Sequence, residues 1–164
     1  MTANDYQRVT AVALRRHFIE VSVEWSVVRN AQDALARDVG RYAPRVDIAV
    51  GPFNTTPNRD PAIRAVPLPR PLRAAVAGLE RNQNPRCLLA IEVVFSGSSK
   101  HIMGDILNAS ALGLYGVVIG KEELMPKIRR ISAYINVLAH LDKMPPLFGN
   151  VLVLSTTDFD ELLA

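Results

Sequence analysis

Acidic residues interrupt segments of the sequence that are otherwise apolar. Glu92 lies in the apolar run of residues 87–95, and Asp47 lies in a second apolar run at residues 45–51. A carboxylate in an apolar interior is costly unless it is paired, so each acid needs a partner or a chemical role. If neighbouring strands carry them, the two carboxylates converge and repel each other unless a cation lies between them. Such oxygen ligands suit Mg²⁺ or Mn²⁺, which can polarise a phosphodiester and activate water.

Two further positions fit the same chemistry. Residues 19–28 alternate between apolar and polar side chains, and Glu20 or Glu24 is expected to join the acids from this third strand. Lys100 stands in the first turn of a predicted helix, where a cation opposes the helix dipole, so helix propensity does not select it. Beside a metal site this lysine would stabilise negative charge developing on a phosphoryl group. The alternative is a lysine that only faces solvent.

A strand, a helix and a second strand must position Glu92 and Lys100. Residues 87–95 suit a strand that is buried on both faces. Ser98 or Ser99 can cap a helix over residues 100–112, and residues 115–119 form another buried strand. Two strands joined by a helix in this way usually run parallel, with a right-handed crossover.

The remaining segments complete an α/β pattern. A first helix over residues 5–18, capped by Asn4 or Asp5, would bury Tyr6, Val9, Val12 or Ala13, and Phe18. The strand over 19–28 would place Ile19, Val21, Val23 and Trp25 on one face. Further helices are predicted at residues 30–41, 71–80, 121–141 and 158–163, and a last strand at 151–154. Six prolines predict a loop insertion at residues 52–72. We therefore expect one domain over residues 1–164, with a mixed central β-sheet flanked by helices.

Composition limits the class of protein. The 164 residues are enough for one domain with a real core. No apolar run approaches the length of a membrane helix, and the first residues lack the pattern of a signal peptide, so no membrane partner is expected. A single cysteine, Cys87, excludes an internal disulfide and fits a reducing cytoplasm. Of the 19 basic residues 15 are Arg, which suits phosphate contacts but also follows from Arg-biased coding.

The order of these elements resembles that of the PD-(D/E)xK nuclease superfamily, also called restriction-endonuclease-like. The resemblance rests on Arg45-Val-Asp-Ile-Ala-Val, on Ala90-Ile-Glu-Val-Val and on the crossover that follows, and it covers roughly residues 5–120. Two features depart from the family pattern. Val94 stands where the superfamily keeps its lysine, which implies that Lys100 has replaced it or that catalysis is lost. Val46 precedes Asp47 where the family has a proline.

The resemblance implies a restriction-endonuclease-like fold and a specific set of roles. Asp47 and Glu92 would bind Mg²⁺ or Mn²⁺, with Lys100 assisting catalysis and Glu20 or Glu24 as an accessory acid. The activity would be metal-dependent hydrolysis of phosphodiester bonds in DNA. Homodimers would be expected, because many nucleases of this architecture act as dimers.

Other interpretations of the same residues stay open. Asp47 and Glu92 can each be structural acids paired with an arginine, and His101, Asp105 and Asn108 are most simply solvent-facing. The protein would then be an inactive member of the nuclease fold that binds nucleic acid or serves in assembly. An Arg-surfaced nucleic-acid-binding module without a metal is a third class. No Ser-His-Asp pattern, phosphate-binding Gly-Lys-Ser/Thr loop or zinc spacing is present in the sequence.

Overall fold

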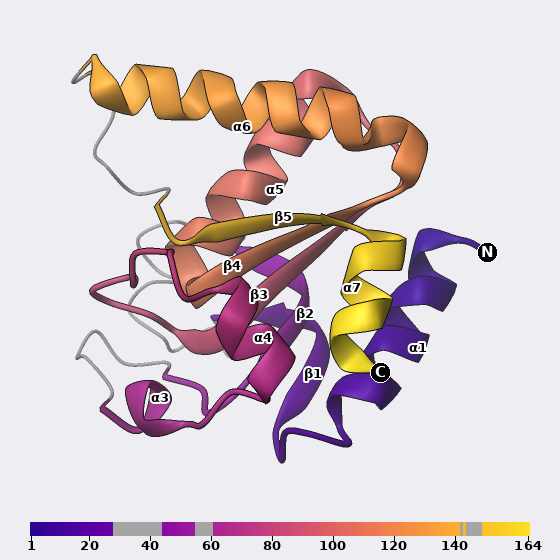
Figure 1. Ribbon diagram of the computed structural model, residues 1–164, viewed down its shortest axis with the longest axis vertical. Coiled ribbons are helices and arrows are strands. Elements are labelled where there is room, and N and C mark those ends of the chain that lie inside the picture. Colours follow the sequence, from indigo (N-terminus) through magenta and orange to yellow (C-terminus); the bar gives the residue numbers. More distant parts are fainter. Residues whose placement is uncertain (28–43, 55–60, 142, 144–148) are drawn as a thin grey trace.

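A five-stranded β-sheet forms the centre of the molecule (Figure 1). The computed structural model describes residues 1–164 except 28–43, 55–60, 142 and 144–148. The strands lie in the order β1-β2-β3-β4-β5. They are β1 (Val21–Ser26), β2 (Arg45–Val50), β3 (Cys87–Val94), β4 (Gly113–Gly120) and β5 (Val151–Ser155).

The sheet is mixed, as the sequence predicts. Strands β1, β2 and β3 are paired antiparallel, whereas β3, β4 and β5 are paired parallel. The helix expected between β3 and β4 forms the crossover that parallel pairing requires. Every residue of β3 and β4 is buried, which explains why these two strands are the most continuously apolar segments of the sequence.

Helices cover both faces of the sheet, so the described residues form one α/β domain with three layers (Figure 1). One face is covered by α5 and α6, and the other by α1, α3, α4 and α7. The helices are α1 (Ala3–Leu14), α3 (Pro61–Ala65), α4 (Arg70–Ala75), α5 (Ser99–Leu112), α6 (Met125–His140) and α7 (Thr156–Leu163), with the short 3₁₀ helix η1 (Glu122–Leu124) before α6. Within the described parts of the chain, no helix has the length and apolarity needed to span a membrane.

The first helix differs from its prediction in both its cap and its buried face. Thr2 caps α1, and its side chain and that of Asp5 form a reciprocal capping box. Tyr6 and Phe18 are buried as predicted, and Ala13 rather than Val12 packs against the core. Val9 is 58% exposed and Val12 is 56% exposed, so the prediction is wrong for Val9. The buried stripe of α1 contains two polar side chains, which is why the spacing of its apolar residues predicted the buried face only in part. The buried residues are Tyr6, Gln7, Thr10, Ala11 and Leu14.

The first strand is shorter than predicted and has an unusual backbone conformation at Glu24. Ile19 precedes β1 and is fully exposed, so it does not share a face with Val21 and Val23. Glu24 has a φ of 51°, a left-handed conformation that is uncommon for a residue other than glycine. After this residue, Trp25 packs in a separate cluster, where its ring stacks on Phe53 at a centroid distance of 5.1 Å.

Several other boundaries differ from the sequence predictions. Residues 61–65 and 70–72 of the expected proline-rich loop belong to α3 and α4, and α4 ends at Ala75 rather than near residue 80. The helix expected at residues 30–41 lies outside the described residues. The prediction for α5 is confirmed, because Ser98 caps it by accepting a hydrogen bond from the backbone N–H of His101. Pro126 lies in the first turn of α6, where a proline is tolerated.

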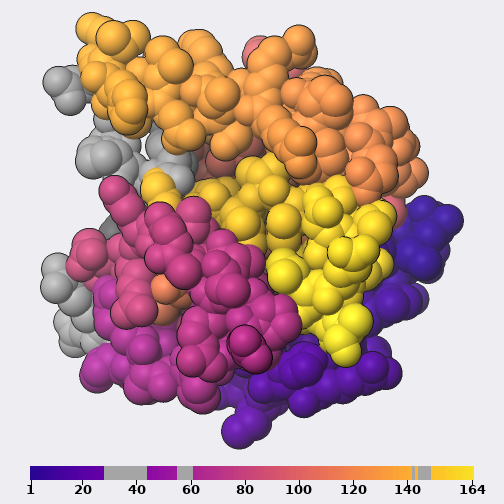
Figure 2. Space-filling view, in the orientation of Figure 1, coloured from indigo at the N-terminus to yellow at the C-terminus, as the bar shows by residue number. Residues whose placement is uncertain are grey.

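The segments at the two ends of the described chain lie side by side. Figure 2 shows α7 against α1 on one face of the molecule. The hydroxyl of Tyr6 on α1 donates to the carboxylate of Asp160 on α7 at 2.8 Å. This contact joins two segments separated by 154 residues of sequence.

Candidate functional site

The hydrogen-bond ladder between β2 and β3 ends at two acidic residues. The last paired residues at this end are Ile48 and Ile91, and the next two positions are Asp47 and Glu92. The backbone N–H of Asp47 donates to Oε2 of Glu92 at 3.3 Å, and the backbone N–H of Val93 donates to Oδ2 of Asp47 at 2.8 Å. Each carboxyl group therefore accepts from the backbone of the opposite strand, where the regular ladder stops.

The two carboxyl groups also influence each other. The charge of Asp47 raises the pKa of Glu92, and the side chain of Gln7 lies near enough to Asp47 to lower its pKa. Glu92 is only 5% exposed, and Gln7 is equally buried. The sequence-based expectation that Asp47 and Glu92 come together is therefore met by the geometry of the strands that carry them.

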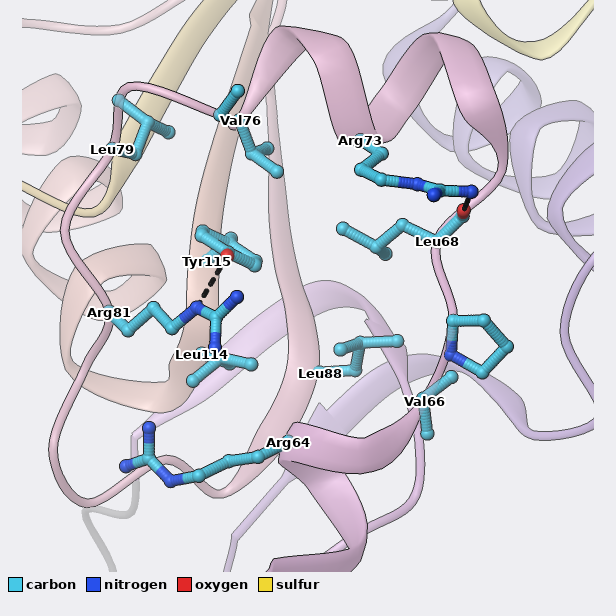
Figure 3. Close-up of a pocket in the computed structure, with 12 residues that line it drawn as sticks. Arg64, Val66, Leu68, Arg73, Val76, Leu79, Arg81, Leu88, Leu114 and Tyr115 are labelled. Atoms are coloured by element: carbon cyan, nitrogen blue, oxygen red, sulfur yellow. Dashed lines mark hydrogen bonds between the residues drawn. The ribbon is translucent and has the colours of Figure 1, made fainter.

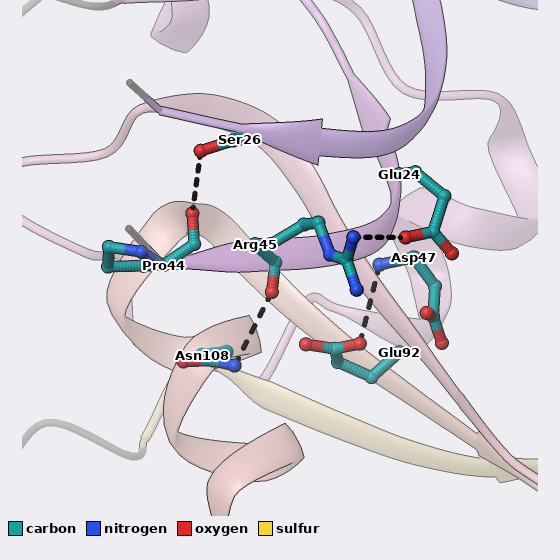
Figure 4. A network of polar contacts seen from close by, with 7 residues as sticks. All are labelled: Glu24, Ser26, Pro44, Arg45, Asp47, Glu92 and Asn108. Carbon is teal, nitrogen blue, oxygen red and sulfur yellow. Dashed lines mark hydrogen bonds and ion pairs between the residues drawn. The ribbon is translucent and has the colours of Figure 1, made fainter. Parts of the chain in front are cut away.

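Helix α5 adds polar side chains from the other layer. Nδ2 of Asn108 donates to the backbone carbonyl of Arg45 at 3.4 Å (Figure 4), and the same side chain lies near enough to Glu92 to lower its pKa. Asp105 stands one turn earlier and is half-buried. It lies close enough to affect the ionisation of both Asp47 and Glu92. We call Asp47, Glu92 and Asp105 the acidic cluster.

The pKa of each carboxyl group in the acidic cluster is raised above its ordinary value. Burial raises the pKa of Glu92 to about 9, and the nearby charges of Asp47 and Asp105 act in the same direction. Burial and the charge of Asp47 raise the pKa of Asp105 to about 6, although His101 opposes that shift. The pKa of Asp47 is also raised, first by burial and then by the charge of Glu24, while the N–H of Val93 opposes the rise.

Of the two candidate accessory acids, only Glu24 lies near Asp47. It continues the β1–β2 register opposite Asp47, and its Oε2 lies 3.1 Å from the guanidinium of Arg45 (Figure 4). Glu20 lies at the opposite end of β1, where its backbone carbonyl accepts from the N–H of Gly51. The structure thus separates the two residues that the sequence left as alternatives.

Among the described residues, no lysine contacts the acidic cluster. Lys100 is exposed at the first turn of α5, and within the described residues it forms no hydrogen bond or ion pair. Val94 occupies the position two residues after Glu92 and is 2% exposed, packed against Ile102 and Val118. The face of α5 nearest the cluster instead presents His101, Asp105 and Asn108.

Three members of this site were missed or misassigned from the sequence. The sequence predicts that Asp105 and Asn108 face solvent, and it gives no indication that Gln7 belongs to the site. The spacing of His101, Asp105 and Asn108 was an available signal, because residues at i, i+4 and i+7 share one helix face. Gln7 gave no such signal, since a buried glutamine is recognisable only once the packing of α1 is known.

The donor set fits a hard divalent cation held by few protein ligands. Among the residues that the structure describes, no three His, Cys, Asp or Glu side chains form a ready-made metal site. Asp47 and Glu92 supply two converging carboxyl groups, and Mg²⁺ is commonly bound by one or two carboxylates, with water and substrate phosphates completing its shell. A cation at this position would also offset the repulsion from Asp47 and Asp105 that raises the pKa of Glu92, and the repulsion from Glu24 that raises the pKa of Asp47.

Comparison with known proteins gave no match. None of the protein-family models, curated proteins or solved structures compared with this chain is significantly similar to it.

Proposed function

We propose that this protein is a divalent-metal-dependent nuclease that hydrolyses phosphodiester bonds in DNA. One observation carries the proposal: Asp47 and Glu92 stand side by side at the open end of the β2–β3 ladder, where each carboxyl group accepts a hydrogen bond from the backbone of the opposite strand. A purely structural pair would be stabilised by an arginine, but the guanidinium of Arg45 binds Glu24. Two acids buried together without a cation are costly, and that cost is consistent with a site built for an ion.

The residues of the chain have distinct roles in this proposal. Asp47 and Glu92 would hold Mg²⁺ or Mn²⁺, with the backbone N–H groups of Val93 and Asp47 fixing the orientation of their carboxyl groups and with Gln7 and Asn108 beside them. Asp105 is a half-buried carboxyl group with a pKa of about 6, so near neutral pH it can accept a proton from water. The ion, when bound, supplies Lewis acidity toward the phosphate and lowers the pKa of a coordinated water.

A second candidate is a member of the same fold that binds nucleic acid, or assembles with partners, without cleaving it. Buried Val94 and exposed Lys100 favour it, because no lysine contacts the acidic cluster in the described part of the chain. A positive charge at this place would be expected to stabilise the transition state of phosphodiester hydrolysis. The two candidates make opposite predictions for cleavage and the same prediction for binding.

Cleavage of supercoiled plasmid and of end-labelled single-stranded DNA distinguishes the candidates. With Mg²⁺ or Mn²⁺ we expect nicking that EDTA abolishes. Asp47→Asn and Glu92→Gln keep the size and hydrogen-bonding capacity of the side chains but remove the charge. Each should reduce the cleavage rate by about a hundredfold or more.

Two further variants complete the design. Glu161→Gln removes an exposed carboxylate on α7, far from the cluster in the fold, and should cleave like the wild type. Lys100→Met tests whether the exposed lysine takes part. Unchanged cleavage in both Asp47→Asn and Glu92→Gln would refute the metal site. Salt-sensitive DNA binding by the wild type without cleavage would establish the second candidate.

A further inference from the structure

A cavity of about 340 Å³ lies between α3, α4 and the beginnings of β3 and β4 (Figure 3). This volume is at the lower end of the range of small-molecule sites. Leu88 on β3, which lines the cavity, precedes Glu92 by four residues on the same strand, a separation of roughly 13 Å at 3.3 Å per residue. The cavity is therefore separate from the acidic cluster.

The body of the cavity is apolar. Leu88 and Leu114 contribute from the sheet and are almost fully buried, and Val76 contributes from the end of α4. Leu68 and Leu79 extend the apolar wall from the segments on either side of α4 (Figure 3). A surface of this kind gains most from contact with hydrocarbon or an aromatic ring, and it offers few partners for a polar molecule.

Three guanidinium groups stand around this apolar body. They belong to Arg64, Arg73 and Arg81, and the described residues that line the cavity include no Asp or Glu. Within the described chain none of the three forms an ion pair with a carboxylate. Cations gathered in this way without a counter-charge repel one another, and an anion among them would relieve that repulsion.

Hydrogen bonds to the protein hold these guanidinium groups in place. Arg64 donates from Nη2 to the backbone carbonyls of Asn82 and Gln83 at 2.9 and 3.1 Å. Arg73 donates from Nη2 to the carbonyl of Leu68 at 3.3 Å. Because a guanidinium has five N–H donors, each side chain keeps several for a ligand. The groups are fixed in advance, which lowers the entropic cost of binding an anion.

Tyr115 provides an independent indication of a ligand. Its side chain lies in the cavity wall, and its hydroxyl oxygen accepts from Nε of Arg81 at 2.9 Å (Figure 3). Tyr115 is 5% exposed, and its own O–H proton has no acceptor among the described residues. The hydroxyl proton of this largely buried side chain is therefore free to bond an anion beside Arg81.

We propose that this cavity binds a small amphipathic anion, an apolar body that carries one carboxylate or phosphate group. The apolar body would contact Leu88 and Leu114, and the anionic group would accept hydrogen bonds from Arg81, Arg64 and the hydroxyl of Tyr115. Arg73 adds positive charge at the rim. This assignment does not depend on the nuclease activity.

Calorimetric titration of the full chain with octanoate and octyl phosphate tests the proposal and distinguishes a carboxylate ligand from a phosphate ligand. We expect at least one of the two to bind at least tenfold more tightly than 1-octanol, which lacks the charge, and inorganic phosphate, which lacks the apolar body. The double variant Arg64→Gln/Arg81→Gln should weaken that binding by about tenfold or more, because charge-assisted hydrogen bonds are lost.

Two variants guard against loss of structure as the explanation. Arg70→Gln removes an exposed arginine that does not line the cavity and should bind like the wild type. Ala77→Phe introduces a ring at an exposed lining position and should block both anions while circular dichroism shows an unchanged fold. Equal affinity for octanoate, octyl phosphate and 1-octanol would overturn the proposal. So would the absence of binding, or binding that the arginine substitutions leave unchanged.

Discussion

Glu92 carries a proton at neutral pH because of where the chain places it. Its pKa of about 9 has three causes in the same direction: burial, Asp47 and Asp105. Because the charge of Asp47 acts on Glu92, the two carboxyl groups titrate as a coupled pair. A bound divalent cation would displace this proton, so proton release and metal binding are linked at this pair.

The stability of the protein should therefore fall as pH rises. The folded pKa of Glu92, about 9, lies above the ordinary value of 4.5, so between these values the folded state holds a proton that the unfolded chain has released. The stabilisation is fully present below pH 4.5 and is lost as pH rises through 9, with a slope of at most about 1.4 kcal/mol per pH unit for one proton. Asp105 adds a change of the same sign between 3.8 and about 6.

Urea unfolding of the wild type and of Glu92→Gln across pH 5–9 measures this effect. The variant cannot titrate at position 92, so its free energy of unfolding should decline less steeply above pH 6. Glu161→Gln, which removes an exposed carboxylate, should keep the wild-type slope. Parallel curves for the wild type and Glu92→Gln would show that Glu92 is ionised in the folded protein near neutrality.

Metal binding should restore part of the stability that the protein loses as pH rises. At pH 8, Mn²⁺ or Mg²⁺ should raise the melting temperature of the wild type, because the ion binds the deprotonated pair that only the folded chain assembles. The increase should be smaller at pH 6, where protons compete. Asp47→Asn and Glu92→Gln should show little or none of it by differential scanning fluorimetry. An equal rise in all three proteins would place the ion elsewhere.

At the residue scale, the sequence revealed the acids that lie in strands but not their neighbours from the helices. Asp47 and Glu92 were recognisable because a carboxyl group is conspicuous in an apolar strand. Asp105 and Asn108 lie on the half-polar face of a helix, where such residues are ordinary. What makes them part of the site is the placement of α5 against the open end of β2–β3, which no local pattern encodes.

The approach of α5 to β4 depends on a glycine. A Cβ atom added at Gly116 would come within 2.7 Å of the backbone carbon of Ala109 and 2.9 Å of its oxygen. Backbone atoms of a packed helix cannot move aside as the end of a flexible side chain can. Gly116 therefore sets how closely α5, with Asp105 and Asn108, lies against the sheet.

Two glycine-to-alanine substitutions test this packing. Gly116→Ala should destabilise the protein by about 1–3 kcal/mol through overpacking and should also reduce DNA cleavage. Gly104→Ala adds the same methyl group within α5, where nothing lies within 4 Å, and should stabilise the helix by about 0.5–1 kcal/mol. Denaturant unfolding measures both. A Gly116→Ala protein as stable as the wild type would show that α5 shifts without cost.

Secondary structure followed from local sequence where one chemical signal dominated. Strands β3 and β4 are continuously apolar, and α5 has a capping serine, so β3 and α5 were predicted to within one residue and β4 to within two. The face of helix α1 was predicted only in part, because its buried stripe includes Gln7 and Thr10, whose polarity hides the period. The left-handed conformation of Glu24 within β1 could not be foreseen, since it depends on the tertiary surroundings of that residue.

At the scale of the whole molecule, β3 is the centre of both the sheet and the core. It pairs antiparallel with β2 and parallel with β4, and helices cover both of its faces (Figure 1). The α/β class and the mixed sheet followed from the order of apolar segments. The full strand order and the layer that each helix joins did not, because they depend on contacts between segments distant in sequence.

Native-state hydrogen exchange should show stronger protection in the central strands than in the edge strands. Amides in β3 and β4 should exchange only through global unfolding, because both strands are buried along their whole length. Amides in β1 and β5, at the two edges of the sheet, should exchange through smaller local openings. Similar protection in β1 and β3 would mean that the sheet opens as one unit.

The contact between α1 and α7 also determines when the site can be assembled during synthesis on the ribosome. Tyr6, one residue before Gln7, is held by Asp160, which is added 154 residues later. At ordinary elongation rates that interval is roughly 10–30 s. During this time α1 lacks its partner helix, and the amide beside Asp47 lacks its final support. A growing chain would therefore expose its acidic pair before the pair is fully organised.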